Sequence, residues 1–390
     1  MQDETRLNGT TWPDRDNSKA TTINPPIYKG STVLFDSYAD MVKINRGEYQ
    51  GIIYGTDRLP TQRQFEEALR ELEEGSLTRI FQSGIAAIQT VLMAFCKSGD
   101  HILICDNAYS PGQLFCKSVL KKFNIDHTLI PPNTGANIEQ YIQDNTVLIL
   151  LESPGSISFE LQDVPAITEI AKQKNIVTVM DNTWATPLFL KPLSLGIDVS
   201  LHSVTKYISG YSDVLAGAVT LGEQYAATFD AFYKEMEIYT PAEDCYLSLR
   251  GLHSLGPRLR QHEQSALTIA KWLSGHPLVD QVLHPALPSH PEHHIWKRDF
   301  KGSSGLFGFT FKSDYNQEQL GTFIDSLALF HLGFSWGGYK SLVTAGKLRR
   351  STPCRYDNTT IIRLNIGLEG SEDLQNDLEA GLSKLKLPLR

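Results

Sequence analysis

Hydrophobic and polar positions follow two different periods along the middle of the chain. Short apolar runs typical of buried strands occupy residues 101–105, 145–152, 175–181, 199–204 and 213–222. Between several of them lie stretches with helical spacing, such as residues 164–175, where Val164, Ile167 and Ala171 share one face. Strands that alternate with helices predict a largely parallel sheet covered on both sides.

Two further helices are predicted before these strands, at residues 61–75 and 84–99. The pattern changes again after about residue 245. Residues 245–277 read as one long helical region, whereas residues 304–311 and 359–368 alternate like strands with one buried face. Amphipathic helices are predicted at residues 316–329 and 371–386. This mixture predicts a smaller α+β unit built on an antiparallel sheet.

The first sixty residues are weakly periodic and rich in Thr, Asn, Pro and Gly. Such a segment cannot form its own core, so we expect an extended arm that packs on a neighbouring subunit. The predicted organisation is therefore an arm at 1–58, a large α/β domain at 59–245 and an α+β domain at 246–390.

The composition narrows the class of protein. The chain of 390 residues has 36 basic and 44 acidic side chains, and a net charge of −8 argues against a nucleic-acid surface. No apolar run is long enough to span a membrane, and the N-terminal residues lack the apolar core of a signal peptide. The five cysteines are odd in number and have no CxxC spacing. We expect a cytoplasmic protein with reduced thiols and a small-molecule substrate.

Lys206 lies in an unusual setting, between two predicted buried strands in "LHSVTKYISGYSD". A lysine in a core is costly unless it is paired or chemically used. In an open parallel sheet, ligands bind at the carboxyl ends of the strands. The polar residues that follow the predicted strands, or precede the first buried helix, are Tyr109, Glu152, Ser153, Asp181, Asn182, Ser203, Thr205 and Lys206, together with Ser83 and Gly84.

Each of these residues has an ordinary structural explanation when it is taken alone. Most lysines are solvated, an aspartate after a strand is most often a cap, and a tyrosine in a loop is commonly a half-buried anchor. Taken together they fit the needs of pyridoxal phosphate. That cofactor requires a lysine amine for its aldehyde and an acid for its ring nitrogen, which Lys206 and Asp181 supply.

The same cofactor needs an aromatic side chain on its face and a helix N-terminus with hydroxyls for its phosphate. Tyr109 supplies the aromatic ring. The phosphate donors would be the backbone of residues 83–85, which includes Gly84 and Ile85, and the side chains of Ser203 and Thr205. A lysine committed to a covalent bond as an imine also avoids the burial penalty of its charge.

Specific motifs run along essentially the whole chain, among them "LESPGSISFELQDVPAI", "DNTWATPLF", "TKYISGYSD", "WKRDFKGSSGLFGF", "FSWGGYKSL" and "IIRLNIGLE". The sequence resembles the Cys/Met-metabolism pyridoxal-phosphate enzymes of fold type I, and most closely the bacterial cystathionine β-lyases. "SWGGY", with Trp336, is similar to the β-lyase branch. The resemblance implies a mostly parallel seven-stranded sheet with an N-terminal arm and a smaller C-terminal domain.

By this resemblance, Lys206, Asp181 and Tyr109 keep the roles given above, and Gly84, Ile85, Ser203 and Thr205 meet the phosphate. Arg363 would bind the substrate α-carboxylate, aided by Ser335 and Trp336. Tyr54 would enter the site of the neighbouring subunit in a homotetramer built from two dimers. Taken alone, Arg363 in an alternating strand could equally form a surface ion pair.

The implied reaction is cleavage of L-cystathionine to homocysteine, pyruvate and ammonia, a step of methionine biosynthesis. Another reaction on the same cofactor stays open: γ-elimination or γ-replacement, cysteine desulfhydration, cleavage of cysteine S-conjugates or a racemase side activity. All of them share the abstraction of the α-proton. A third alternative is a non-enzymatic relative that kept the fold.

Two positions depart from the family pattern. In the arm motif "YGTDRLPT", Thr56 stands where the family has a phosphate-binding arginine, and Arg58 lies two residues further on. We expect Arg58 to turn back to the phosphate, because an under-neutralised buried phosphate is costly. The alternative is that Arg58 serves elsewhere. In the motif after the lysine, Tyr211 replaces a histidine.

Four histidines, His284, His290, His293 and His294, are grouped in "HPALPSHPEHH". Metal ligands normally lie on pre-formed elements, and these histidines lie among three prolines. We therefore predict no structural metal.

Overall fold

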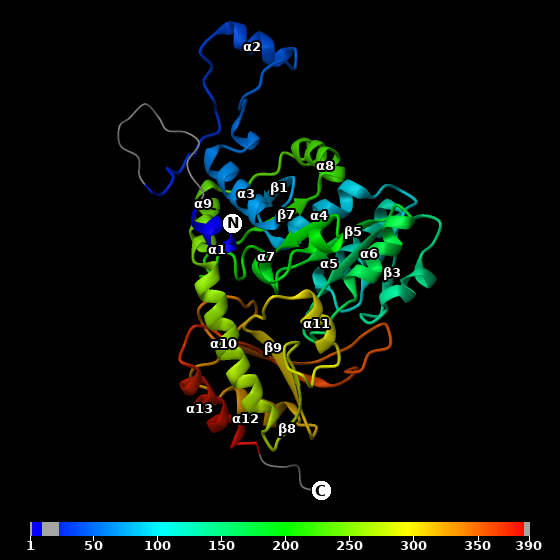
Figure 1. Ribbon diagram of the computed structural model, residues 1–390, viewed down its shortest axis with the longest axis vertical. Coiled ribbons are helices and arrows are strands. Elements are labelled where there is room, and N and C mark those ends of the chain that lie inside the picture. The colour runs from blue at the N-terminus through cyan, green and yellow to red at the C-terminus, as the bar shows by residue number, and fades with distance from the viewer. Residues whose placement is uncertain (1, 10–22, 386–390) are drawn as a thin grey trace.

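The computed structural model describes residues 2–9 and 23–385, which form two β-sheets joined by a long helix (Figure 1). That helix, α10 (Leu255–Ser274), starts beside the larger sheet and runs along the smaller one. Among the described residues, no helix is both long and apolar enough to cross a membrane.

The larger sheet has seven strands in the order β1-β7-β6-β5-β4-β2-β3. The strands are β1 (Leu77–Phe81), β2 (His101–Cys105), β3 (Asp126–Ile130), β4 (Thr146–Glu152), β5 (Val177–Asp181), β6 (Val199–His202) and β7 (Gly217–Leu221). Strand β7 runs antiparallel to both of its neighbours, β1 and β6, and all the other neighbouring pairs are parallel. The predicted mostly parallel seven-stranded sheet is therefore confirmed.

Two of these strands were not predicted, and both are polar at positions where an apolar run is expected. In β1 the central residue is Arg79, whose guanidinium is buried on Asp230 and Glu66. In β3, at the edge of the sheet, the residues are only partly buried and include Asp126 and His127. A buried charge that is paired elsewhere, as in β1, and partial exposure at the edge of a sheet, as in β3, both interrupt the apolar run by which a buried strand is predicted.

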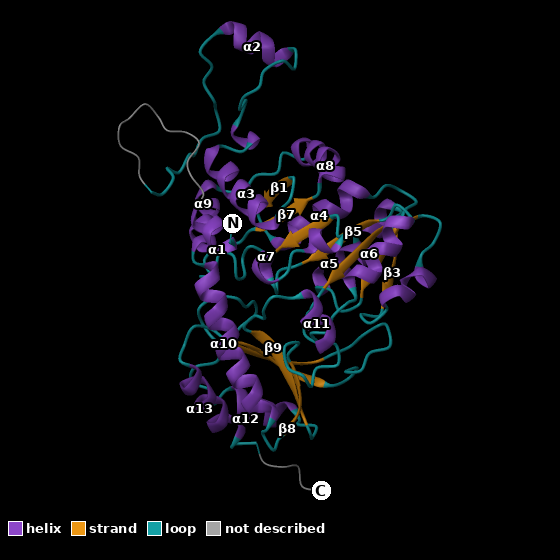
Figure 2. Cartoon of the chain, in the orientation of Figure 1, coloured by secondary structure: helices purple, strands orange, loops and turns teal. Residues whose placement is uncertain are grey.

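Helices cover both faces of the larger sheet (Figure 2). Ile102 and Ile104 of β2 pack into one apolar cluster with α4 (Gly84–Phe95), α5 (Ser110–Ser118) and α8 (Glu223–Glu235). Leu103 and Cys105 of the same strand point to the other face, into a cluster with α6 (Val164–Gln173). Alternate residues of one strand are thus buried on opposite faces, which is why these strands read as continuous apolar runs.

The smaller sheet has five strands in the order β10-β11-β12-β9-β8 and is antiparallel except between β10 and β11. The strands are β8 (Val279–Leu283), β9 (Leu306–Phe311), β10 (His331–Leu332), β11 (Leu342–Lys347) and β12 (Thr360–Asn365). Apolar side chains of α10, α12 (Gln317–Ile324) and α13 (Ser371–Leu382) pack in one cluster with this sheet. Strands β9 and β12 match predicted strands, whereas β8, β10 and β11 lie where no strand is predicted.

The predicted single helical region at 245–277 consists of two helices. The first, α9 (Ala242–His253), is followed directly by α10, and Ser254 is the cap residue between the two helices. The domain boundary predicted after residue 245 falls inside α9. The remaining short elements are α7 (Thr186–Phe189), α11 (His293–Asp299) and turns of 3-10 helix at Gly55–Asp57, Leu120–Phe123, Gly135–Tyr141 and Pro192–Leu195.

The N-terminal segment divides into two parts that behave differently. Helix α1 (Asp3–Gly9) packs on its own chain, with Leu7 buried in the same apolar cluster as Phe65 of α3 (Pro60–Glu73). Residues 23–58 are bonded to the body at both ends, through Tyr28 N to Thr61 and Arg58 to Glu66, and their middle part projects from it with α2 (Tyr38–Asn45) at the end (Figures 1 and 2). No residue of α2 is buried, and the side chain of Leu34 is 90% exposed. Residues 10–22 of the predicted arm and 386–390 of the predicted C-terminal domain lie outside the described residues.

Candidate active site

A cavity of about 410 Å³ opens at the carboxyl ends of β4, β5 and β6 and the N-terminus of α4. It brings together side chains from both sheets that are far apart in the sequence. The sequence-predicted residues that line it are Gly84, Ile85, Tyr109, Asp181, Ser203, Thr205, Lys206, Ser335, Trp336 and Arg363. Tyr54 and Arg58 are not among its lining residues.

Lys206 follows β6 in a turn, and its partly buried amine points at the segment before β11. Its Nζ donates a hydrogen bond to Ser335 Oγ at 2.6 Å and lies 5.5 Å from the centre of the Trp336 ring. Burial, and then the positive charge of Arg363, lowers the pKa of Lys206 to about 8, against the opposing effect of Asp181. Near this pH the amine therefore exchanges between its charged and its neutral form, and both are populated.

Asp181 is the last residue of β5, at the edge of the sheet beside Lys206. Its Oδ1 accepts hydrogen bonds from Thr183 N at 2.9 Å and from Thr183 Oγ1 at 2.5 Å. Burial raises the pKa of this carboxyl, while the two bonds from Thr183 oppose the rise. Thr183 Oγ1 also accepts a bond from Ser203 N at 2.8 Å, which joins the ends of β5 and β6.

The N-terminus of α4 forms a tight cradle against the loop after β6. Ser83 caps the helix, its side chain accepting a bond from Ala86 N at 3.1 Å. A Cβ on Gly84 would come within 2.8 Å of Ser203 Cβ, so only glycine fits at this first helical position. The backbone N–H groups of Gly84 and Ile85 are in the first turn, where an α-helix has no internal acceptors for them. This is the donor geometry that a phosphate requires.

The other phosphate candidate, Thr205, already has partners within its own chain. Its hydroxyl donates to Ala216 O at 3.2 Å and accepts a bond from Ala216 N at 3.0 Å. These bonds hold the Lys206 turn against the segment that leads into β7. Thr205 therefore has a structural task in addition to lining the cavity.

The smaller sheet contributes the cationic wall of the cavity. Arg363, in the middle of β12, donates from Nη2 to Ser335 O at 3.5 Å. Burial lowers the pKa of its guanidinium. Ser335 has a φ of 80° and Gly337 a φ of 82°, and a Cβ on Gly337 would come within 2.8 Å of Tyr207 N. The "SWGGY" segment thus packs directly on the backbone of the Lys206 turn, which holds Ser335 between Lys206 and Arg363.

Glu152 lies at the end of a predicted strand but has no role predicted from the sequence. Glu152 is in register with Asp181 across β4 and β5, and it lines the same cavity. Its Oε2 accepts a bond from Tyr109 N at 2.6 Å, and its Oε1 lies 2.7 Å from Ser156 Oγ. The signal that could have found it is its place at the end of the strand next to the one that ends in Asp181.

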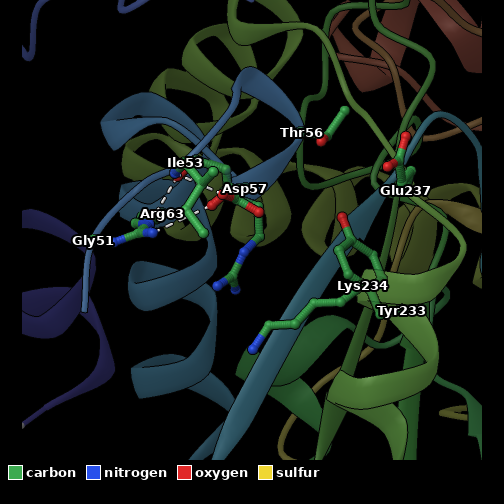
Figure 3. Close-up of a pocket in the computed structure, with 9 residues that line it drawn as sticks. Gly51, Ile53, Thr56, Asp57, Arg63, Tyr233, Lys234 and Glu237 are labelled. Atoms are coloured by element: carbon green, nitrogen blue, oxygen red, sulfur yellow. Dashed lines mark hydrogen bonds between the residues drawn. The ribbon is translucent and has the colours of Figure 1, made fainter. Parts of the chain in front are cut away.

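The turn that follows Tyr54 borders a second, separate cavity of about 300 Å³ between the projecting segment and α8 (Figure 3). Asp57 closes this turn by accepting hydrogen bonds from Ile53 N at 2.7 Å and Tyr54 N at 3.1 Å. Arg63 donates to the carbonyls of Arg58 at 2.7 Å and Asp57 at 3.3 Å. The side chain of Tyr54 is half exposed.

The guanidinium of Arg58 is paired within its own chain. Its Nη1 lies 3.0 Å from Glu66 Oε2, and that carboxylate also pairs with Arg79 at 3.2 Å. Burial raises the pKa of Glu66, and the two arginines oppose the rise. A buried carboxylate thus holds the guanidinium of Arg58 within one chain, and the turn of Arg58 toward a phosphate stays a prediction.

The four grouped histidines do not converge on one point. His293 Nδ1 is bonded to Pro285 O at 3.0 Å, and the Nδ1 of His284 accepts a bond from Ala286 N at 3.2 Å. Across residues 2–9 and 23–385 there is no group of three or more His, Cys, Asp or Glu side chains placed to hold a metal ion.

The pairing of Arg58 predicts a loss of stability on its removal. Arg58→Ala leaves Glu66 buried with Arg79 as its remaining cation, so we expect a loss of about 1–3 kcal/mol, the cost of an incompletely paired buried charge. The shift in the midpoint of urea unfolding measures this loss. The control is Arg63→Ala, which removes an exposed arginine bonded only to carbonyls and should shift the midpoint much less. Equal midpoints for Arg58→Ala and the unchanged protein would contradict the pairing.

Comparison with known proteins agrees with this arrangement. A family described as Cys/Met metabolism PLP-dependent enzyme matches residues 10–383. The cystathionine beta-lyase of Escherichia coli is 38% identical over 371 residues, which cover 93% of this chain and 94% of that protein. An L-alanine/L-glutamate racemase of Wolbachia pipientis is also 38% identical and covers 93% of both chains.

Among solved structures, the cystathionine gamma synthase of Xanthomonas oryzae pv. oryzae superposes with a TM-score of 0.89 at 30% identity, over 99% of this chain and 98% of that one. The family match covers most of the chain, and the residues at the edge of the larger sheet fit the cofactor that the family uses. The chain therefore belongs to the PLP-dependent enzymes of Cys/Met metabolism, and pyridoxal phosphate is its cofactor.

Proposed function

We propose that the protein is a carbon–sulfur β-lyase that converts L-cystathionine to homocysteine, pyruvate and ammonia. The observation that carries the proposal is the amine of Lys206, whose pKa is lowered to about 8 within a cavity that also holds Arg363 and Asp181. The relatives named cystathionine beta-lyase support the reaction type. Trp336, beside Lys206, supports the same branch.

Each residue then has a defined task. Pyridoxal phosphate, when bound, supplies a ring that withdraws electrons from the substrate α-carbon. Arg363 holds the substrate carboxylate by a charge-assisted pair of hydrogen bonds. Asp181 would pair with the ring nitrogen, and the Gly84–Ile85 backbone with Ser203 and Thr205 would hold the phosphate.

Lys206 is the general base in this proposal. In its neutral form Nζ takes the α-proton, and its bond to Ser335 Oγ fixes the direction from which it approaches. The thiolate that leaves the β-carbon takes a proton from the Lys206 ammonium or from the Tyr109 hydroxyl. The apolar wall formed by Trp336, Phe159 and Leu306 keeps water from the reacting carbons.

A racemase is the second candidate, because one relative of equal similarity bears that name. Racemisation and β-elimination share the removal of the α-proton by a base. The two reactions differ in the next step, since a racemase returns a proton to the opposite face of the same carbon. Lys206 and Tyr109 both line the cavity, so the same pair of groups serves either reaction.

Product identification tests the reaction type. The purified holoenzyme is incubated with L-cystathionine, and we expect pyruvate and homocysteine in equal amounts. Lys206→Ala should lose essentially all turnover, because it removes both the amine that would bind the cofactor aldehyde and the base that would take the α-proton. Formation of 2-oxobutyrate and cysteine would assign the protein to γ-elimination. Conversion of L-alanine to D-alanine without pyruvate from cystathionine would assign it to racemisation.

The pH dependence of cofactor loading tests the environment of Lys206. Only the neutral amine reacts with an aldehyde, so loading of the cofactor-free protein should rise with pH around a midpoint of about 8, well below the ordinary lysine value of 10.5. Arg363→Gln removes the neighbouring positive charge and should move the midpoint upward, whereas Arg363→Lys, which keeps a charge, should move it less. The rise in visible absorbance after mixing at a series of pH values gives the midpoint. An unchanged midpoint in Arg363→Gln would rule out the effect of its charge.

The projecting segment supports an active site shared between subunits. Tyr54 does not line the cavity of its own chain, and within the described residues no side chain of α2 is buried. We infer that Tyr54 reaches the cofactor of a neighbouring subunit in a homotetramer.

Subunit mixing tests this inference. Lys206→Ala and Tyr54→Ala should each be inactive or strongly impaired alone. After dissociation and reassembly together, activity should return, because mixed pairs contain one site with both residues intact. Light scattering should give the mass of a tetramer. An active monomer, or no recovery after verified subunit exchange, would contradict a shared site.

A further inference from the structure

Two carboxyl groups lie side by side at the edge of the larger sheet. Glu152 ends β4 and Asp181 ends β5, and the two residues are paired in register. Residues paired in this way on adjacent strands project from the same face of a sheet, with their backbones about 5 Å apart. Both line the cofactor cavity. The reaction proposed above uses Asp181 and leaves Glu152 without a task.

The contacts of Glu152 lead to Tyr109 and not to the substrate side. Its Oε2 accepts the backbone N–H of Tyr109 at 2.6 Å, and Tyr109 is the residue that caps α5. Its Oε1 lies 2.7 Å from Ser156 Oγ. One side chain therefore links the aromatic ring proposed to cover the cofactor with the strand edge that carries Asp181.

Two adjacent carboxyls in a partly buried site cannot both ionise without a large repulsion. The surroundings decide which one carries the charge. Asp181 accepts two hydrogen bonds from Thr183 and is further stabilised as an anion by His202 and Lys206. Burial, and then the charge of Asp181, raises the pKa of Glu152 to about 8, although Ser156, the Tyr109 N–H and Arg350 act against the rise.

At neutral pH Glu152 thus retains a proton, and its contacts suit the neutral acid. Oε2 accepts from Tyr109 N, and Oε1 accepts from Ser156 Oγ, a bond whose direction would reverse with the proton on Oε1. No bond of the group is lost by protonation, because a serine hydroxyl can accept as well as donate.

We propose that Glu152 is a positioning residue that acts as a neutral acid: it holds Tyr109 in place through the backbone while leaving Asp181 as the single carboxylate that faces the cofactor ring. This inference rests on the roles of Asp181 and Tyr109 in the proposed function. It does not depend on which substrate is cleaved, so it can be tested on the binding of pyridoxal phosphate alone.

The test compares Glu152→Gln with Glu152→Ala in the holoenzyme at pH 7. Glutamine is neutral, accepts from Tyr109 N and donates to Ser156, so its visible circular dichroism and its rate of cofactor release should match those of the unchanged protein. Alanine leaves Tyr109 N without its acceptor, and cofactor release should be faster by about fivefold, the value of one hydrogen bond. Ser156→Ala, which keeps the Tyr109 bond, is the matched control and should resemble glutamine.

The charge state is tested by raising the pH. Above about pH 8 the unchanged protein acquires a second charge beside Asp181 and should release cofactor faster, whereas Glu152→Gln should not. Asp181 and Arg350, which act on Glu152, and Lys206 and His202, which act on Asp181, are the same in both proteins, so their effects cancel in the ratio of the two rates. A glutamine variant that behaves like alanine at pH 7, or a ratio that stays constant with pH, would overturn the proposal. Neither readout involves turnover, so failure of the proposed lyase reaction would be seen separately, in the product assay.

Discussion

The removal of the Lys206 amine from water is the constraint on which the site depends. An ammonium group in a half-closed cavity loses hydration, and the nearby guanidinium of Arg363 makes the charged form still less favourable. The same two effects that are unfavourable for a charge make the neutral amine available as a base and nucleophile. The parallel sheet makes this possible, because it delivers the ends of β4, β5 and β6 to one edge while its interior stays apolar.

Much of the larger sheet and of the site could be predicted because the relevant residues carry strong local signals. The strands β2, β4, β5, β6 and β7 are buried on both faces and read as apolar runs, and their ends identify Asp181 and Lys206. Strands β1 and β3 were missed for physical reasons. Arg79 is buried in β1 because Asp230, far along the chain, pairs with it, and β3 is an edge strand with exposed polar residues. Neither the pairing of Arg79 with Asp230 nor the edge position of β3 can be read from the neighbouring residues in the sequence.

The limits are clearest in the residues whose roles depend on distant partners. Arg58 is expected to face a phosphate because a charge is missing at Thr56, and the local pattern gives no sign that Glu66, eight residues further along, binds its guanidinium within one chain. Leu7 belongs to a segment without a core of its own, yet it packs beside Phe65. Glu152 could be placed at a strand end, but its link to Tyr109 requires the loop geometry of residues 152–156. The hydrophobic pattern identifies helices and strands, whereas the partner that a side chain binds depends on the folded arrangement of distant residues.

The position of Ser335 has a mechanical consequence. It accepts a hydrogen bond from Lys206, which belongs to the larger sheet, and its carbonyl meets Arg363 of the smaller sheet. The separation of the two cationic groups is therefore a measure of how the two sheets sit against each other. A displacement that brings the sheets together strengthens the repulsion between the two cations and favours release of a proton by Lys206, and a displacement apart favours its uptake. An anion that neutralises Arg363 reduces this repulsion. By the reciprocity of linked equilibria, substrate binding, the protonation of Lys206 and the relative position of the two sheets are therefore thermodynamically coupled.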